Sequence, residues 1–262
     1  REKISRYFLS EKVAKYKYDL GVNIMALPTM DHPTYELQIP STKKKIKYRP
    51  FLVKEEKVLL LAMESGDENN IKQAVIDLLT ACIKSKIKIE SLSLFDLEYI
   101  FLNIRAVSVG EVVEMKLTCT DDGETEVPYS LNLTEISVLF PKGHTNKIML
   151  TEETGVIMKY PSFKTFVDQN FGTGESITQD NLTVIIAENI DQIFQGEDVY
   201  DSSTTTPKEF IEFVDSLTNE QLVKIQTFFE TSPRLEHTFM VTNPNTGVES
   251  EYVLRGLNSF FG

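Results

Sequence analysis

The sequence predicts an α+β protein of two related modules, each a β-hairpin, then several helices, then a ribbon-like β-hairpin, preceded by an N-terminal amphipathic helix. Three observations predict this fold. Segments with apolar residues at helical spacing alternate with short segments of period two, turns rich in Gly and Pro separate them, and the order of segments repeats. The predicted boundaries are an N-terminal helix and linker over 1–33, a first module over 34–140 and a second over 141–262.

The composition is that of an acidic globular chain. Of 262 residues, 41% are hydrophobic and 25% are charged, which is too apolar for a disordered protein, and the net charge is −12. No apolar run approaches the roughly 20 residues that span a bilayer, and the charged start lacks the apolar stretch of a secretory signal. Cys82 and Cys119 are too few for a disulfide framework. We therefore expect a soluble protein of a reducing cytoplasm.

Residues 2–20 predict the N-terminal helix. One face carries apolar residues at helical spacing, and Lys and Glu fill much of the rest. The apolar residues are Leu9, Val13, Tyr16 and Leu20. Because a Pro-containing stretch over 26–33 separates this helix from the modules, it either docks on a partner protein or packs back on its own chain. The pattern leaves both interpretations open.

The first module begins with a hairpin of residues 34–39 and 43–49, which Pro50 ends. Three helices follow. The first runs from Leu52 to Ser65 and closes at Gly66, and the third runs from a capping box at Ser93 and Asp96 to about Ala106. The second carries an apolar stripe of Ile71, Ala74, Val75, Leu78, Leu79 and Cys82. Strands over 112–118 and 127–133 then flank the turn Cys119-Thr-Asp-Asp-Gly123.

The second module repeats this order. A hairpin of 147–151 and 156–160 precedes helices at about 162–170, 178–194, 207–217 and 219–230. Thr206 with Glu209 and Thr218 with Gln221 are capping boxes that start the last two helices. The final hairpin pairs 237–242 with 248–255 across the turn Asn243-Pro-Asn-Thr-Gly247.

Residue matches between the halves support a duplication. At an offset of 112, Thr42, Tyr48 and Phe51 meet Thr154, Tyr160 and Phe163, and at an offset of 124, Thr118, Gly123 and Leu133 meet Thr242, Gly247 and Leu257. A longer helical section in the second half would absorb the change of offset. We therefore expect two related modules rather than a solenoid, which needs three or more repeats.

The charge is distributed unevenly along the chain. Residues 1–57 carry 13 Lys and Arg against 7 Asp and Glu, and the densest basic run is Lys43, Lys44 and Lys45. This run is either a solvated hairpin tip, the favoured interpretation, or a basic segment that binds an acidic protein partner. The net negative charge argues against binding to nucleic acid.

We find no motif for catalysis or for a cofactor. Phosphate-binding, dinucleotide-binding, zinc-protease and serine-hydrolase patterns are missing, and the three histidines, His32, His144 and His237, are each expected at the surface. A metal site of Cys119, His144 and His237 would rest on composition alone. The two Gly-containing turns have the geometry of zinc-ribbon knuckles, but Cys119 stands alone and Asn243 occupies the equivalent place. We therefore expect no catalytic, cofactor-binding or metal-binding residues.

Several phrases resemble the baseplate hub proteins of T-even-type contractile-tailed phages, the family that holds the hub subunit and the hub-assembly catalyst. The most specific are residues 37–51 (LQIPSTKKKIKYRPF) and 53–66 (VKEEKVLLLAMESG), and residues 95–111, 154–161 and 253–261 fit too. The resemblance runs from about residue 34 to the end.

The resemblance implies a non-enzymatic late phage protein that helps build the baseplate in the host cytoplasm. Its partners would be other hub or tape-measure proteins, with oligomerisation possible and no membrane involved. It would be either a hub subunit retained in the virion or a transient assembly chaperone. Relatives carry C-x-x-C-G knuckles where this chain has Cys119–Gly123 and Asn243–Gly247, a departure that leaves a degenerate zinc ribbon, or a hydrolytic protein built on one, as a remote alternative.

Overall fold

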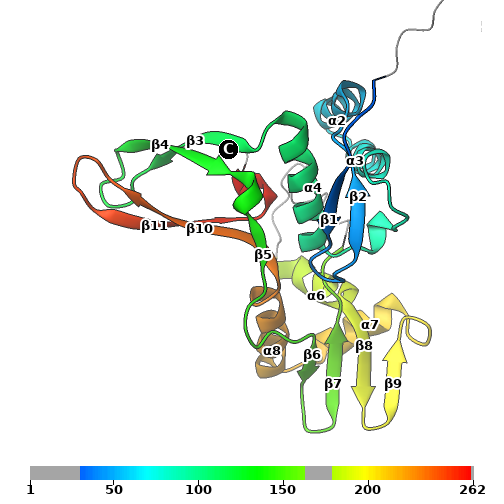
Figure 1. Ribbon diagram of the computed structural model, residues 1–262. Helices are drawn as coiled ribbons and strands as arrows, with labels where there is room; N and C mark the ends of the chain where they lie inside the picture. Colours follow the sequence, from blue (N-terminus) through cyan, green and yellow to red (C-terminus); the bar gives the residue numbers. More distant parts are fainter. Residues whose placement is uncertain (1–29, 163–178, 261–262) are drawn as a thin grey trace, which may run out of the picture. The chain divides into compact units, whose positions relative to one another are not determined.

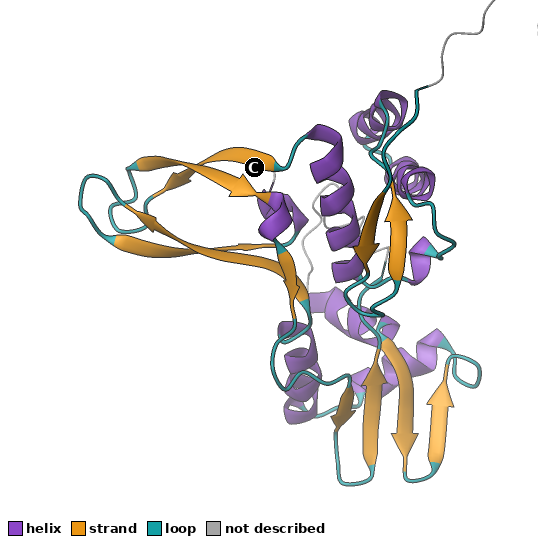
Figure 2. Ribbon diagram, viewed as in Figure 1, coloured by secondary structure: helices purple, strands orange, loops and turns teal. Residues whose placement is uncertain are grey.

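The computed structural model describes residues 30–162 and 179–260, and the chain divides into two compact units, residues 1–32 and 33–262. The helix predicted over 2–20, with Leu9, Val13, Tyr16 and Leu20, therefore lies outside the described residues, as does nearly all of the helix predicted at 162–170. The second unit mixes helices with small antiparallel sheets, which confirms the predicted α+β class (Figures 1 and 2).

The unit opens with the predicted hairpin of β1 (Tyr35–Gln38) and β2 (Lys45–Tyr48). Ile46 and Tyr48 face the core and the alternate lysines face solvent, as period two requires. The turn of this hairpin is attached to a later helix, because the buried carboxylate of Asp96 accepts a hydrogen bond from the backbone N–H of Ser41 at 2.9 Å.

Three helices follow the hairpin, with a 3₁₀ turn η1 (Ile89–Ser91) before the last. They are α2 (Val53–Ser65), α3 (Glu68–Cys82) and α4 (Leu94–Val109). Gly66 closes α2 in the left-handed conformation at φ 64°, as predicted. The capping box predicted at Ser93 does not form: its hydroxyl donates to Asp96 at 2.6 Å and accepts no backbone N–H, although α4 still begins directly after it.

Two long hairpins follow the pattern predicted for the ribbons. They are β3 (Val112–Thr118) with β4 (Glu126–Asn132), and β10 (Arg234–Thr242) with β11 (Glu249–Arg255). A 3₁₀ turn η2 (Leu133–Glu135) leads to a short strand, β5 (Ser137–Leu139), that the sequence pattern did not reveal. β5 pairs with the start of β10, with Leu235 opposite Val138, so residues about a hundred positions apart share one sheet.

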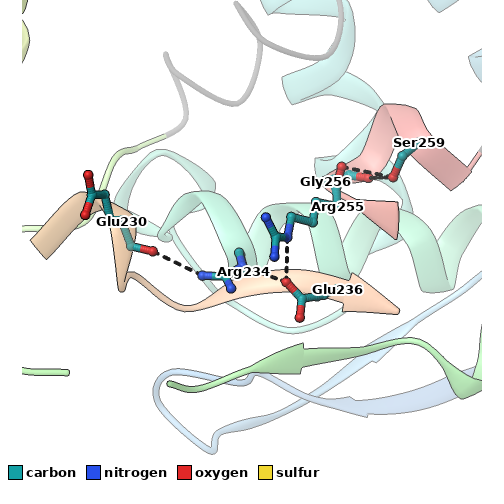
Figure 3. A network of polar contacts seen from close by, with 6 residues as sticks. All are labelled: Glu230, Arg234, Glu236, Arg255, Gly256 and Ser259. Carbon is teal, nitrogen blue, oxygen red and sulfur yellow. Dashed lines mark hydrogen bonds and ion pairs between the residues drawn. The ribbon is translucent and has the colours of Figure 1, made fainter. Parts of the chain in front are cut away.

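A polar network joins the start of β10 to residues 255–259 (Figure 3). Glu236 accepts hydrogen bonds from Arg234 at 2.8 Å and from Arg255 of β11 at 2.7 Å. Arg234 also donates to the carbonyl of Glu230, and Ser259, in the terminal 3₁₀ turn η3 (Leu257–Phe260), donates to the carbonyl of Arg255.

The remaining strands form one four-stranded sheet in the order β6-β7-β8-β9. They are β6 (Lys147–Met149), β7 (Thr154–Met158), β8 (Ile190–Gln195) and β9 (Asp198–Asp201). The helix predicted over 178–194 is confirmed as far as residue 188 and wrong over 189–194, because α6 (Gln179–Glu188) ends before Asn189 and β8 begins at Ile190. The i, i+3 spacing of Ile190 and Ile193 mimics a helix, but pairing with β7 on one side and β9 on the other makes this segment a central strand.

Two further helices of the described residues are capped, α7 (Pro207–Asp215) and α8 (Asn219–Glu230). Both predicted capping boxes form, with the hydroxyls of Thr206 and Thr218 each accepting the N–H of the third helical residue.

Most of the buried apolar side chains of the described residues form two clusters. One joins β1, β2 and α2–α4 and includes Leu235 and Phe260 from the C-terminal part of the chain. The other joins β6–β8 with α6–α8, around Val156, Ile186 and Ile225. The division into modules at residue 140 stays a prediction.

Candidate functional site

The turns that end the two long hairpins have matching backbone geometry. The N–H of Gly123 donates to the carbonyl of Cys119 at 2.9 Å, and the N–H of Gly247 donates to the carbonyl of Asn243 at 2.8 Å. Both glycines are left-handed, at φ 70° and 74°, a conformation that favours glycine. We call residues 119–123 and 243–247 the knuckle pair.

The knuckle pair is held together by hydrogen bonds between side chains. Asn243, only 1% exposed, donates from Nδ2 to both carboxylate oxygens of Asp121 at 3.0 and 3.1 Å and to Asp122 Oδ2 at 2.9 Å. The hydroxyl of Thr246 donates to Asp121, and the amide of Asn245 donates to Thr125 at 2.9 Å. Residues more than a hundred positions apart thus form one polar joint.

These contacts shift the titration of three groups in the joint. Hydrogen bonds from Asn243 and Thr246 hold the pKa of Asp121 below its usual range. Bonds from the hydroxyl and N–H of Thr125 and from Asn243 lower the pKa of Asp122. Burial of the Cys119 thiol raises its pKa, and the neighbouring carboxylates raise it further. The raised pKa makes Cys119 a poor nucleophile.

The knuckle residues do not fit a zinc ion. A zinc ribbon places thiolates or imidazoles at the first and fourth positions of each knuckle, and here those positions hold Cys119, Asp122, Asn243 and Thr246. The amide of Asn243 directs an N–H donor at carboxylates, where a metal needs an electron pair. Over residues 30–162 and 179–260, no group of three or more His, Cys, Asp and Glu side chains is arranged to hold a metal ion.

His144 is not the surface residue that we expected. Its ring is half-buried, with Nδ1 3.0 Å from the hydroxyl of Thr231 and Nε2 3.0 Å from the hydroxyl of Tyr160. The ring of Phe228 lies 5.1 Å away, and burial lowers the pKa of His144. This histidine links Tyr160, two residues after β7, to Thr231 at the end of α8, beside the second cluster. No local signal in the sequence reveals this packing role.

The sequence matches one family closely enough to place the chain. A family model described as T4 bacteriophage base plate protein covers residues 32–262, nearly the whole length. The chain belongs to this family. The comparisons with curated proteins and with solved structures found no match. The resemblance drawn from residues 37–51 and 53–66 is thus confirmed at the level of a phage base plate protein, and the family match begins after the predicted N-terminal helix.

Within this base plate protein, the basic residues singled out from the sequence lie at the β1–β2 turn. Lys43 has a positive φ of 58°, and its ammonium lies 5.0 Å from the centre of the Phe140 ring, a cation–π contact inside the chain. Lys44 and Lys45 are exposed. The other predicted partner-binding residues, Leu9, Val13, Tyr16 and Leu20, lie outside the described residues.

α2 carries a large exposed apolar surface that was not predicted from the sequence. Leu59 and Ala62 are buried, but Val53 is 80% exposed and Leu61 is 54% exposed. The other exposed apolar side chains of α2 are Val58, Leu60 and Met63. This exposure could have been predicted from the unbroken apolar run Val58-Leu-Leu-Leu-Ala-Met63. Such a run places apolar side chains on every face of a helix, and a helix packed on one side leaves some of them exposed. A shallow groove of about 310 Å³ runs between α2 and α3, lined by Val58, Leu61 and Ala74 among others.

None of the helices in the described part is long and apolar enough to cross a membrane.

Proposed function

We propose that this chain is a baseplate hub protein that takes part in tail baseplate assembly by binding other proteins, without catalysing a reaction. The exposed apolar face of α2 supports the proposal most directly. Contiguous apolar side chains on a protein surface mark sites of protein contact, and membership of the base plate family supplies the class of partner. The partners would be other hub proteins or a tape-measure protein.

The geometry of α2 suggests how such a partner is recognised. Leu61 and Val58 line one side of the groove, and Ala74 of α3 lines the other. A groove between two helices fits the apolar side of a third helix, which interdigitates with the exposed side chains. Burial of Leu60 and Leu61 would contribute about 1.5–3 kcal/mol for each side chain fully removed from water.

The non-enzymatic part of the proposal rests on the candidate site. The knuckle pair engages its carboxylates with amide and hydroxyl donors and holds Cys119 as a buried thiol with a raised pKa. His144 is occupied by two hydroxyls in an aromatic cluster. These groups stabilise the fold, and their arrangement does not present a nucleophile beside a general base.

Two forms of the function are compatible with these features. The protein is either a hub subunit retained in the virion or a late assembly chaperone that leaves before the tail is complete. Quantitative mass spectrometry of purified tails and of infected-cell lysate separates them. A fixed copy number in tails indicates a subunit, and presence in baseplate-protein complexes of the lysate without presence in tails indicates a chaperone. Absence from both tails and baseplate complexes contradicts the proposed function.

A further inference from the structure

The segment that follows α3 brings a second set of lysines to the basic β1–β2 hairpin. Ile83 bridges to Tyr48 in antiparallel fashion, and the N–H of Lys84 donates to the carbonyl of Lys47 at 2.7 Å. The N–H of Lys47 in turn donates to the hydroxyl of Ser85 at 2.9 Å. Residues 83–85 therefore lie along the edge of β2 that does not pair with β1.

The alternation of side chains places the lysines of both segments outward. Ile46, Tyr48 and Ile83 are buried in the first apolar cluster, and the lysines next to them in the chain are exposed. The exposed lysines are Lys43, Lys44, Lys45 and Lys47 from the hairpin and Lys84, Lys86 and Lys88 from the segment after α3. We call these seven residues the lysine patch.

In the described part of the chain, the ion pair found at the lysine patch is a weak one. Lys47 pairs with Glu36 of β1 at 3.6 Å, with both side chains more than half exposed, so this ion pair is weak. On the other side of Lys47 lies Lys84, and like charges on adjacent strands destabilise a sheet. Yet the chain as a whole carries a net charge of −12. A concentrated positive surface on an acidic protein is therefore a local feature and not a consequence of overall composition.

We propose that the lysine patch is a docking surface for an acidic segment of another protein. The inference rests on the proposed function, because it names a second contact surface of a protein that acts by binding. An extended acidic segment lying along β2 and residues 83–88 would meet lysines from both. It would also relieve the repulsion between Lys47 and Lys84.

Charge favours a protein over nucleic acid as the occupant. A nucleic acid presents a long uniform negative charge that extends beyond the patch, where it would meet the acidic remainder of this chain. A short acidic segment reaches the lysines and avoids that repulsion. Flexible lysines, rather than rigid arginine forks, also suit carboxylates in variable positions.

The test compares two charge-reversal variants of the full chain that differ only in where the charges lie. The patch variant carries Lys45→Glu, Lys84→Glu and Lys86→Glu. The control variant carries Lys72→Glu, Lys159→Glu and Lys208→Glu, three lysines that are also exposed but lie on α3, after β7 and on α7. The probe is a fluorescent peptide of consecutive Glu residues, measured by fluorescence anisotropy at low and at physiological salt.

We expect the native chain and the control variant to bind the peptide alike, and the patch variant to bind it more than about tenfold more weakly. Because Glu at position 84 would face Lys47, the patch variant should unfold at or above the native temperature, which separates lost binding from lost folding. Equal weakening of both variants, or no weakening of the patch variant, overturns the proposal.

Two further outcomes assign the surface to a different occupant and also overturn it. Tighter binding of a DNA oligonucleotide than of the acidic peptide, lost in the patch variant, would make nucleic acid the occupant. Self-association of the native chain in sedimentation, lost only in the patch variant, would make it a second copy. Since the peptide assay needs no phage protein, its failure leaves the proposed baseplate role standing, and that role is tested separately by co-purification.

Discussion

The side-chain amide of Asn243 donates to both carboxylate oxygens of Asp121, a residue 122 positions earlier in the chain. This contact joins the tips of two hairpins that the sequence places in different halves. Because Asn243 is buried and its Oδ1 also accepts the N–H of Asn245 at 2.8 Å, one side chain fixes its own turn and attaches it to the other. Hydrogen bonds thus join the two turns at the position where a zinc ribbon would hold a metal ion.

Replacing Asn243→Ala should therefore destabilise the protein by about 1–3 kcal/mol, the usual range for removing a buried hydrogen-bonding group whose partners are charged. Chemical denaturation with urea measures the change. Asn245→Ala is the matched control, since its side chain is exposed and makes a single bond across the joint, to Thr125. A loss for Asn243→Ala no larger than that for Asn245→Ala would show that the joint does not stabilise the fold.

Leu78 tests the first apolar cluster. Its side chain is buried on α3 with Val75 and Leu79, as the predicted stripe requires. Leu78→Asp places an unpaired charge there and should destabilise the protein by about 4 kcal/mol or more, enough to unfold this part of the chain. Circular dichroism and thermal unfolding measure it, with the exposed Lys72→Asp on the same helix as control. A cooperative transition near the native temperature for Leu78→Asp would mean that the stripe does not face a core.

His144 predicts a pH dependence of stability. Burial lowers its pKa below the ordinary value of 6.5, so the unfolded chain takes up a proton at a higher pH than the folded protein does. The contribution of neutral His144 to the free energy of unfolding is therefore fully present above pH 6.5, the ordinary pKa of histidine. It is lost as the pH falls toward the pKa of His144 in the folded protein. His144→Gln retains an amide for Thr231 and Tyr160 but does not titrate.

We expect the free energy of unfolding of the native chain, relative to His144→Gln, to fall between about pH 7.5 and pH 5. Urea denaturation across this range measures the difference between the two proteins. Parallel curves would contradict a shifted pKa for His144.

Deletion of the N-terminal segment tests whether the helix predicted over 2–20 docks on a partner. Removal of residues 1–25 should leave a folded protein, because the described members of both apolar clusters come from residues 37–260. If the helix docks on a partner, the shortened chain should bind baseplate proteins more weakly while unfolding at the native temperature. Unchanged binding would remove the docking interpretation, and loss of folding would show that the helix packs on its own chain.

Local signals predicted much of the fold. Neighbouring residues determine the capping boxes at Thr206 and Thr218, and both form as predicted. They also determine the turns at Gly66 and at the knuckle glycines, which have the left-handed conformation at the predicted positions. Pairings between distant segments were not predictable in this way. β5 was missed because three residues give no period, and β8 was taken for helix because its neighbours β7 and β9, not its own spacing, determine its state.

The same distinction applies to the candidate sites. The sequence identified both knuckles but not the contact between Asp121 and Asn243, which depends on the packing of two hairpins. It identified Lys43, Lys44 and Lys45 but not the lysines after α3, because only the pairing of Ile83 with Tyr48 brings them together. The apolar run of α2 was visible, whereas the side that it leaves exposed depends on where α3 packs.

The proposed function requires that this base plate protein binds other baseplate proteins through α2. The most direct measurement is quantitative mass spectrometry of proteins that co-purify with the tagged chain from infected cells. It compares the native chain, Leu60→Gln with Leu61→Gln, and a control of Lys57→Gln with Glu64→Gln on the same helix. We predict that baseplate proteins are enriched with the native chain and the control and depleted with the leucine variant. Failure of the native chain to enrich any baseplate protein, or equal enrichment by all three, would contradict the account.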